Sequence, residues 1–323
     1  MTAPRPVRFG VVVPALESSG ELNEIISRAE DLGYAALLFV DHLTSRPAPL
    51  VAAATALARS TRLRVGTQVI AAPLHHPLML AKEVTTLDLL SDGRFDFGLG
   101  AGWPRDSDFG RSDFDQTGID PGDARARADR LIETVRVFQR FQASTQRWDH
   151  QGARWQLRNI DPFPFSGPRR RTPLVIGGAG QRLLRFAARH ADIVNIAPRP
   201  PVAGRTTAGG QAFGTTIAEQ VAVIRAAAGE RYRRLELAVM STGDAAALTG
   251  DHGAGQRRLT RLAALLNTTV QGAAGMPSTL IGSRGQLLDR VLEQRERYDI
   301  TYRTVPAAAM VQFAPLVADL AGR

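Results

Sequence analysis

Short apolar segments alternate with segments of helical spacing along almost the whole chain of 323 residues. Eight of the apolar segments are typical of buried strands: 7–13, 36–40, 63–70, 94–99, 174–176, 193–196, 235–240 and 300–305. A helical pattern follows each of them: 22–32, 50–58, 80–90, 124–142, 181–190, 217–228, 287–292 and 307–321. Eight such pairs predict an α/β fold, a closed (β/α)8 TIM barrel, rather than an open doubly wound sheet.

Three segments rich in glycine, proline and polar residues interrupt the alternation: 143–172, 197–214 and 241–279. We interpret them as insertions after barrel strands, where loops that shape substrate pockets commonly lie. Residues 1–323 are therefore expected to form a single barrel domain with these insertions.

Composition excludes several classes of site and location. The chain has no cysteine, which rules out disulfides, thiolate nucleophiles and iron–sulfur clusters. His-x-x-x-His and His-Glu-x-x-His pairings do not occur, so we expect no metal site. The apolar runs are far shorter than the roughly 20 residues of a membrane span, and the first residues lack the features of a secretory signal. We therefore expect a cytoplasmic protein with no membrane partner.

The net charge of +9 resides in the second half of the chain. Residues 1–161 hold 19 basic and 20 acidic residues, whereas residues 162–323 hold 21 basic and 11 acidic residues. Most basic residues are spread along helical stretches with acidic partners, and aromatic residues do not alternate with them, so no nucleic-acid partner is expected. The excess charge fits either an anionic small ligand or an arginine-rich surface without a special role.

Reactive groups of such a barrel lie at the C-terminal ends of its strands. The second strand ends in Asp41 and His42, and histidine titrates near neutral pH, so His42 is the candidate acid/base residue. A lone histidine at a strand end is also commonly structural. His75, beyond the third strand, is interpreted first as a helix-entry residue and second as part of the pocket lining.

Two glycine-rich segments also follow predicted strands. Around Gly98 and Gly100 the spacing is not that of a dinucleotide fingerprint, and we expect these glycines to let a flat ring approach the backbone. The segment Gly177–Gly180 stands between a buried strand and a helix, where free backbone N–H groups would hold a phosphate. A tight turn that needs glycine is the alternative.

These features resemble the luciferase-like monooxygenase superfamily, and within it the branch that uses the deazaflavin coenzyme F420 in place of flavin. The most specific match is the stretch from Thr86-Leu87-Asp88 through Gly98-Leu99-Gly100-Ala101-Gly102-Trp103. The segments that match are 41–43, 63–67, 77–103, 173–178, 183–192 and 280–283.

The resemblance implies a cofactor ring across the C-terminal mouth of the barrel. His42 would lie near the ring carbon that exchanges hydride, with Asp41 as a neighbouring contact. Gln68-Val69 falls where the family often has a non-proline cis peptide that backs the ring. The other cofactor contacts that the resemblance implies are Gly98, Gly100, Ile176, Gly177, Gly178, Ala179, Gly180, Ile193 and Val194.

The expected substrate pocket contains one departure from the family pattern. Many relatives have a glutamate shortly after the glycine segment, whereas this chain has Asp106 and Asp108 and then Asp113 in a second, similar cluster. The sequence does not single out which aspartate faces the substrate. Together with His75 and Trp103, these three aspartates form the expected substrate pocket.

The resemblance implies hydride transfer between coenzyme F420 and a small organic substrate. The long polar insertions suggest a roomy mouth, which favours reduction of an activated C=C or C=N bond over alcohol oxidation. An FMN-dependent monooxygenase on the same barrel and a non-catalytic protein that binds the cofactor are the alternatives. The basic second half of the chain would attract the polyglutamate tail of F420. Barrels of this family often form homodimers, but no interface is evident in the sequence.

Overall fold

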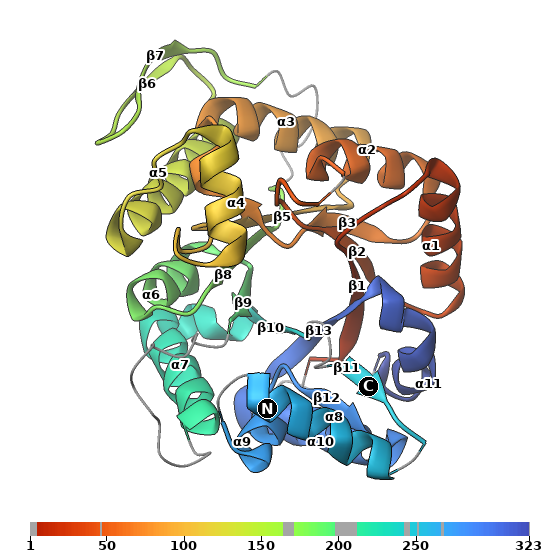
Figure 1. The fold of residues 1–323 in the computed structure, drawn as a ribbon. Coiled ribbons are helices and arrows are strands. Elements are labelled where there is room, and N and C mark those ends of the chain that lie inside the picture. Colours follow the sequence, from red (N-terminus) through yellow and green to blue (C-terminus); the bar gives the residue numbers. More distant parts are fainter. Residues whose placement is uncertain are drawn as a thin grey trace.

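A computed structural model describes residues 5–45, 47–163, 171–197, 212–241, 246–250, 252–265 and 268–322. Parallel strands pair in the order β3-β2-β1-β13-β10-β9-β8-β5, and β5 also pairs with β3, which closes the sheet (Figure 1). The barrel strands are β1 Arg8–Val13, β2 Ala36–Phe39, β3 Arg64–Thr67, β5 Phe95–Gly100, β8 Leu174–Gly178, β9 Ile193–Ile196, β10 Glu236–Met240 and β13 Ile300–Pro306. The predicted (β/α)8 barrel is confirmed.

A ring of helices surrounds the strands (Figure 1). It consists of α1 Ser19–Asp31, α2 Pro49–Arg59, α3 Pro77–Leu90, α5 Ala124–Ala143, α6 Gln181–His190, α7 Ala212–Ala228, α10 Arg284–Tyr298 and α11 Met310–Leu320. Short 3-10 turns η1 Ala72–Leu74, η2 Gly229–Arg234 and η4 Ala307–Ala309 join some of these elements. Local sequence determines where several helices begin. For example, Ser283 and Gln286 form a capping box at the start of α10.

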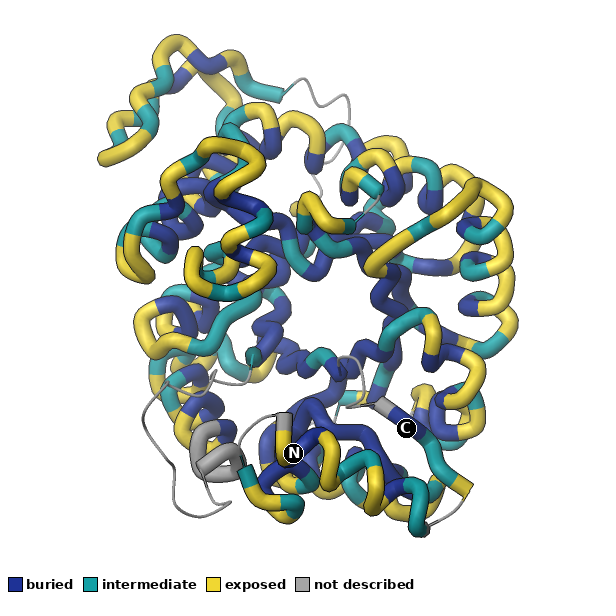
Figure 2. Tube along the Cα trace, viewed as in Figure 1, coloured by how far each residue is buried: buried dark blue, intermediate teal, exposed yellow. Residues whose placement is uncertain are grey.

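Apolar side chains pack in two layers. Alternate strand residues such as Val11, Phe97 and Ile176 pack outward against the helices, and residues such as Val12, Leu38 and Val175 fill the barrel interior. Buried residues accordingly follow the strands and the inner faces of the helices (Figure 2). Strands buried on both sides explain the continuous apolar runs of the sequence.

Two ion pairs occupy the N-terminal end of the barrel interior. Arg8 of β1 donates two hydrogen bonds to Glu236 of β10, at 2.9 and 2.6 Å, and Arg64 of β3 pairs with Asp96 of β5 at 2.7 Å. Burial is the largest single influence on the Arg8 guanidinium and would lower its pKa, but the hydrogen bonds with Glu236 and the nearby charges of Glu236 and Asp96 together raise the pKa above its ordinary value. These polar groups close the end of the barrel opposite the mouth.

The third strand and the segment after the fifth differ from the prediction. The expected strand 63–70 is split by a cis peptide between Gln68 and Val69, after which β4 Ile70–Ala71 continues alongside β5. The segment after Trp103 contains a helix that the sequence analysis did not identify, α4 Asp108–Thr117, with Ser107 as its N-cap.

The segment 143–172 follows helix α5, not a barrel strand as we expected. It forms the antiparallel hairpin of β6 Trp148–Gln151 and β7 Gln156–Ile160, which protrudes from the ring of helices (Figure 1). Buried Glu133 of α5 anchors the hairpin by accepting hydrogen bonds from the N–H groups of Trp155 and Arg154.

The insertion 241–279 does follow a barrel strand, β10. It contains β11 Ala246–Leu248, α8 His252–Leu265 and α9 Val270–Gly275, and β11 pairs in parallel with β12 Leu280–Gly282. Most of the expected insertion 197–214 lies outside the described residues. Within the described ranges, no helix combines the length and apolarity needed to cross a membrane.

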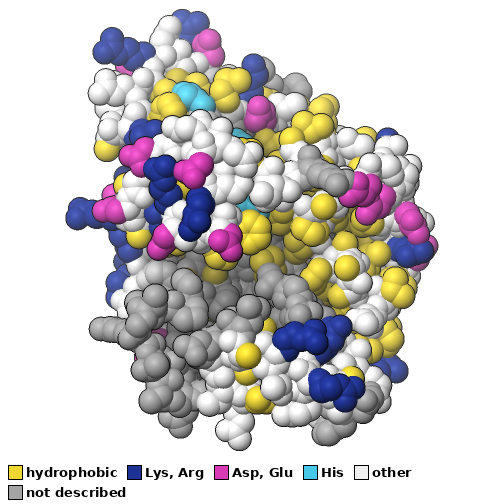
Figure 3. Space-filling view, viewed as in Figure 1, with side chains coloured by type: hydrophobic (Ala, Val, Ile, Leu, Met, Phe, Trp, Pro, Cys, Tyr) yellow, Lys and Arg dark blue, Asp and Glu magenta, His cyan; other side chains and the backbone are white. Residues whose placement is uncertain are grey.

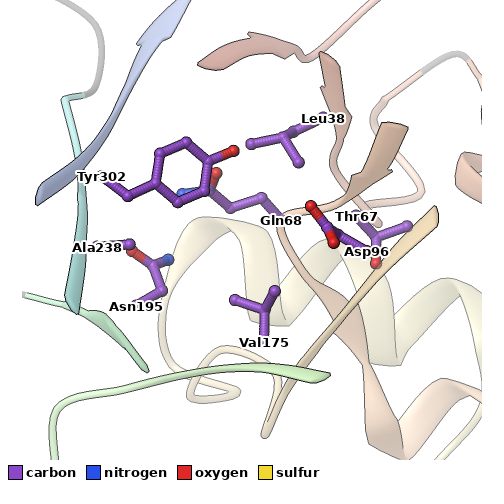
Figure 4. Close-up of a pocket in the computed structure, with 8 residues that line it drawn as sticks. All are labelled: Leu38, Thr67, Gln68, Asp96, Val175, Asn195, Ala238 and Tyr302. Carbon is purple, nitrogen blue, oxygen red and sulfur yellow. The ribbon is translucent and has the colours of Figure 1, made fainter. Parts of the chain in front are cut away.

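A small cavity lies inside the barrel between the ion pairs and the mouth (Figure 4). Its lining residues come from seven strands or their ends: Leu38, Thr67, Gln68, Asp96, Val175, Asn195, Ala238 and Tyr302. The hydroxyl of Tyr302 and the amide oxygen of Asn195 are buried and have no partner among the described residues. A second buried tyrosine, Tyr34, donates its hydroxyl hydrogen to the carbonyl of Met310 at 2.8 Å.

This contrast predicts different effects of the same substitution. Tyr34→Phe removes a buried hydrogen bond and leaves the Met310 carbonyl unpaired, so we expect it to lower the free energy of unfolding by about 1 to 2 kcal/mol. Tyr302→Phe removes a hydroxyl without a protein partner, so we expect no loss or a small gain in stability. Urea unfolding of both variants measures the difference. Equal losses would show that the Tyr302 hydroxyl is hydrogen-bonded in solution.

The closure of the barrel at Gly98 predicts a second stability effect. A Cβ at Gly98 would lie 1.8 Å from the backbone oxygen of Thr67, whereas one at Gly285 in α10 would meet nothing within 4 Å. We expect Gly98→Ala to destabilise the protein by about 3 kcal/mol or to prevent folding, because two strands must separate. Gly285→Ala is the matched control and should stabilise helix α10 by about 0.5 kcal/mol. Urea unfolding tests both, and a Gly98→Ala variant as stable as the control contradicts this account.

Candidate active site

His42 lies just beyond β2 and forms a pair with Asp113 of α4. Its Nδ1 is 2.9 Å from Oδ2 of Asp113, and the other carboxylate oxygen accepts the backbone N–H of Leu43, also at 2.9 Å. Because an ionised carboxylate only accepts hydrogen bonds, the Nδ1 atom carries the hydrogen. Asp113 is 2% exposed, so this contact holds the imidazole in one tautomer and one orientation. Nε2 has no partner among the described residues and is the nitrogen able to exchange a proton.

Aromatic side chains adjoin the imidazole. The ring of Phe109 stacks on His42 with centroids 4.6 Å apart and an interplanar angle of 24°. Trp103 lies next to Phe109 at 5.7 Å and 41°. Phe109 and Asp113 are four residues apart in α4, so one face of this helix supplies both contacts to His42.

Asp41 forms a second pair, with His75. One carboxylate oxygen of Asp41 accepts the backbone N–H of Ala71 at 2.9 Å and lies 2.8 Å from Nε2 of His75. Asp41 is buried and His75 is partly exposed. Consecutive residues at the end of β2 therefore hold different parts of the mouth: His42 contacts α4, and Asp41 contacts the segment after the cis peptide.

The cis peptide and two glycines, Gly100 and Gly177, form a narrow part of the mouth. The predicted cis bond between Gln68 and Val69 is present. A Cβ at Gly100 would come within 2.5 Å of Val69, and one at Gly177 within 3.3 Å. The side chain of Val69 therefore fills the space in which a Cβ at either glycine would lie, and glycine at both positions permits this close packing. Gln68 points elsewhere and donates a hydrogen bond to the hydroxyl of Thr304 at 3.1 Å.

The segment Gly177–Gly180 joins β8 to helix α6. Gly180 is the N-cap of α6 and provides no side-chain hydrogen bond, so the first N–H groups of the helix lack a side-chain cap. A Cβ at Gly180 would meet nothing within 4 Å, whereas one at Gly178 would come within 2.5 Å of Leu183. Gly178 thus permits helix packing, and the amide groups beyond Gly180 can accept an anion.

Buried Gln220 of α7 fixes the loops after β8 and β9. Its side-chain nitrogen donates to the carbonyls of Ala179 and Ala197, each at 3.1 Å. The sequence analysis did not identify Gln220, because a single glutamine in an apolar helix carries no local signal. It also missed Phe109, although Ser107 as an N-cap and the spacing of Phe109 and Asp113 could have indicated helix α4.

Several expected site residues lie away from this group. Ile176 and Val194 pack in the layer between strands and helices, and Ile193 lies low in the barrel interior with Val175 and Ala238. These positions argue against the expectation that Ile193 and Val194 lie beneath a ring at the mouth. The backbone of Gly98 is in contact with β3, because its N–H donates a hydrogen bond to the hydroxyl of Thr67 at 3.0 Å.

The three aspartates of the expected substrate pocket separate in the structure. Asp106 and Asp108 are exposed, and within the described residues no hydrogen bond or ion pair joins either of them to His42, whereas Asp113 forms the pair described above. The described part of the chain contains no group of three or more acidic or histidine side chains arranged to hold a metal ion.

Comparison with known proteins agrees with this fold. Residues 7–299 match the family model for luciferase-like monooxygenases. The structure is similar to an F420-dependent secondary alcohol dehydrogenase solved with an F420-acetone adduct, with a TM-score of 0.73, 16% identity, and coverage of 98% of this chain and 99% of that chain. Identity at this level establishes the common fold alone.

Two relatives share parts of the sequence. A 4-hydroxyprotoasukamycin monooxygenase from Streptomyces nodosus subsp. asukaensis is 33% identical over 142 residues, which span 40% of this chain and 36% of the relative. An F420-dependent glucose-6-phosphate dehydrogenase from Kineococcus radiotolerans is 24% identical over 197 residues, which span 58% of this chain and 56% of the relative. From the family match over most of its length, we conclude that the chain belongs to the luciferase-like monooxygenase family.

Proposed function

We propose that the protein is an oxidoreductase that transfers a hydride between coenzyme F420 and a small organic substrate. The observation that carries the proposal is the pair of His42 and Asp113, with Nε2 of the imidazole left available at the same end of the barrel as the glycine segments. A histidine held by a buried carboxylate is suited to give or take the proton that accompanies a hydride transfer.

The residues at the mouth fit a flat ring with a phosphate. Gly100 and Gly177 let Val69 pack directly against the backbone of β5 and β8, and a planar ring would lie against Val69 at this part of the mouth. The uncapped start of α6 after Gly180 offers backbone N–H groups and the positive end of the helix dipole to the phosphate.

The chain's own part in the reaction is orientation and proton transfer. The deazaflavin would supply the two electrons as a hydride. His42 would donate the proton from Nε2 during reduction of a substrate, or accept one during alcohol oxidation. Asp113 would stabilise the imidazolium form through Nδ1–H, and Phe109 would exclude water from one face of the imidazole.

Two observations support the deazaflavin in particular. F420-dependent enzymes occur among the relatives and the similar structures. Helix α8 of the insertion carries Arg257, Arg258 and Arg261 and no acidic residue, which suits the anionic tail of F420. Basic side chains are visible on the same face as the barrel mouth (Figure 3).

An FMN-dependent monooxygenase is the second candidate. Relatives named as monooxygenases include the asukamycin-type enzyme and a limonene 1,2-monooxygenase from Rhodococcus erythropolis, which is 29% identical over 189 residues. Reduced flavin reacts readily with oxygen, whereas a 5-deazaflavin has carbon at the corresponding ring position.

Titration with F420 and with FMN, each followed by an oxygen-uptake assay of the reduced form, tests the proposal. We expect F420 to bind more tightly than FMN, with a dissociation constant that rises with ionic strength because tail binding is electrostatic. Oxygen uptake should stay at the level of the free cofactor. Tighter FMN binding with oxygen uptake would support the monooxygenase, and binding of F420 without turnover of any alcohol, enone or imine would support a non-catalytic role.

Variants of the His42–Asp113 pair test the proton step. We expect His42→Ala to keep F420 affinity within about threefold and to lower kcat by about 100-fold or more, because general acid catalysis is lost. Asp113→Asn should lower kcat less, since it keeps the shape of the contact but not its charge. Single-turnover kinetics with a substrate from the panel measure both. Wild-type turnover by His42→Ala would refute the assigned role.

A further inference from the structure

Large apolar side chains are exposed around the His42–Asp113 pair. Leu43, Trp103 and Phe109 are 45%, 45% and 46% exposed, and Leu43 adjoins His42 in the chain while Phe109 stacks on its ring. Figure 3 shows that hydrophobic side chains also cover much of the rim of the central hollow on this face. An exposed apolar cluster beside an acid/base residue indicates a binding surface more than a packing defect.

The position of Phe109 in α4 strengthens this interpretation. Phe114 of the same helix is 2% exposed and supplies its packing, so the fold does not require a second phenylalanine there. Phe109 instead lies on the face that carries Asp113 and presents nearly half of its surface to solvent. Contact between an aromatic ring and water is unfavourable. A ligand that covers the ring of Phe109 would therefore gain binding free energy.

The carboxylate beside His42 is already fully paired. Both carboxylate oxygens of Asp113 are occupied, one by His42 and one by the N–H of Leu43. Arg105 pairs with Asp115, and both side chains of this pair are more than half exposed. In the described ranges, no lysine or arginine forms a hydrogen bond or ion pair with His42 or Asp113. Among these residues, a charged ligand would therefore find no cation held at the pair to replace the water that it loses.

We propose that the substrate is a neutral, planar, ring-bearing molecule with one carbonyl or hydroxyl group. Its ring covers Phe109 and Trp103, and its oxygen lies at Nε2 of His42, the one unshared nitrogen of that imidazole. The inference rests on the proposed function, because it assigns the substrate of the same site. An apolar surface with a few placed polar groups is the usual composition of a small-molecule pocket.

Calorimetric titration with two ligands of one shape tests the proposal, using the full chain with and without F420. We expect 2-naphthol, which is neutral, to bind at least 10-fold more tightly than 2-naphthoate, which carries a carboxylate on the same ring system. Glucose 6-phosphate serves as a polar anionic comparison and should bind more weakly than 2-naphthol. Tighter binding of either anion would overturn the proposal.

Variants locate the binding surface. Phe109→Ala should weaken 2-naphthol binding by about 5- to 10-fold through lost aromatic contact. Phe109→Leu keeps an apolar side chain and should recover part of the affinity. Leu90→Ala, at the end of α3 and 78% exposed, is the control and should leave binding unchanged. A Phe109→Ala variant that is folded by circular dichroism and binds 2-naphthol as well as the wild type would refute the assignment.

These experiments distinguish failure of the cofactor proposal from failure of the substrate proposal. If 2-naphthol binds as expected but neither F420 nor FMN does, the cofactor assignment is wrong and the apolar surface stands. If a cofactor binds and an anion is preferred over 2-naphthol, the cofactor assignment stands and the substrate class is wrong.

Discussion

The barrel closes where β3 meets β5, and the candidate active site depends on this closure. The hydroxyl of Thr67 accepts the N–H of Gly98 and donates to the carbonyl of Gly98, at 3.0 and 2.8 Å. The backbones approach so closely that only glycine fits at position 98. Because the strands of the closed sheet are all parallel, their C-terminal ends meet at one mouth, and residues from β2, β4 and β8 become neighbours.

Much of this arrangement could be predicted from the sequence. Strands buried on both faces appear as short apolar runs, and helices appear as apolar residues at a spacing of three and four, so the alternation identifies the barrel. Once the barrel is assumed, strand ends become site candidates. Asp41, His42 and Gly177–Gly180 were found in this way, since each directly follows an apolar run.

The rest depends on information that local sequence lacks. The partner of His42 lies 71 residues away in helix α4, so nothing in the sequence around His42 identifies the contact. Ile176 and Val194 show a second limit: in a strand buried on both sides, alternation of apolar and polar residues is absent, so the sequence does not reveal which side chains face the interior. The hairpin of β6 and β7 was placed after a strand because its polar composition resembles that of an active-site loop.

Asp41 and His42 are consecutive residues just beyond β2, and their side chains contact different segments of the mouth. One peptide unit therefore sets both contacts, to His75 on one side and Asp113 on the other. A movement of this unit would shift both side chains, so neither contact can be adjusted independently of the other.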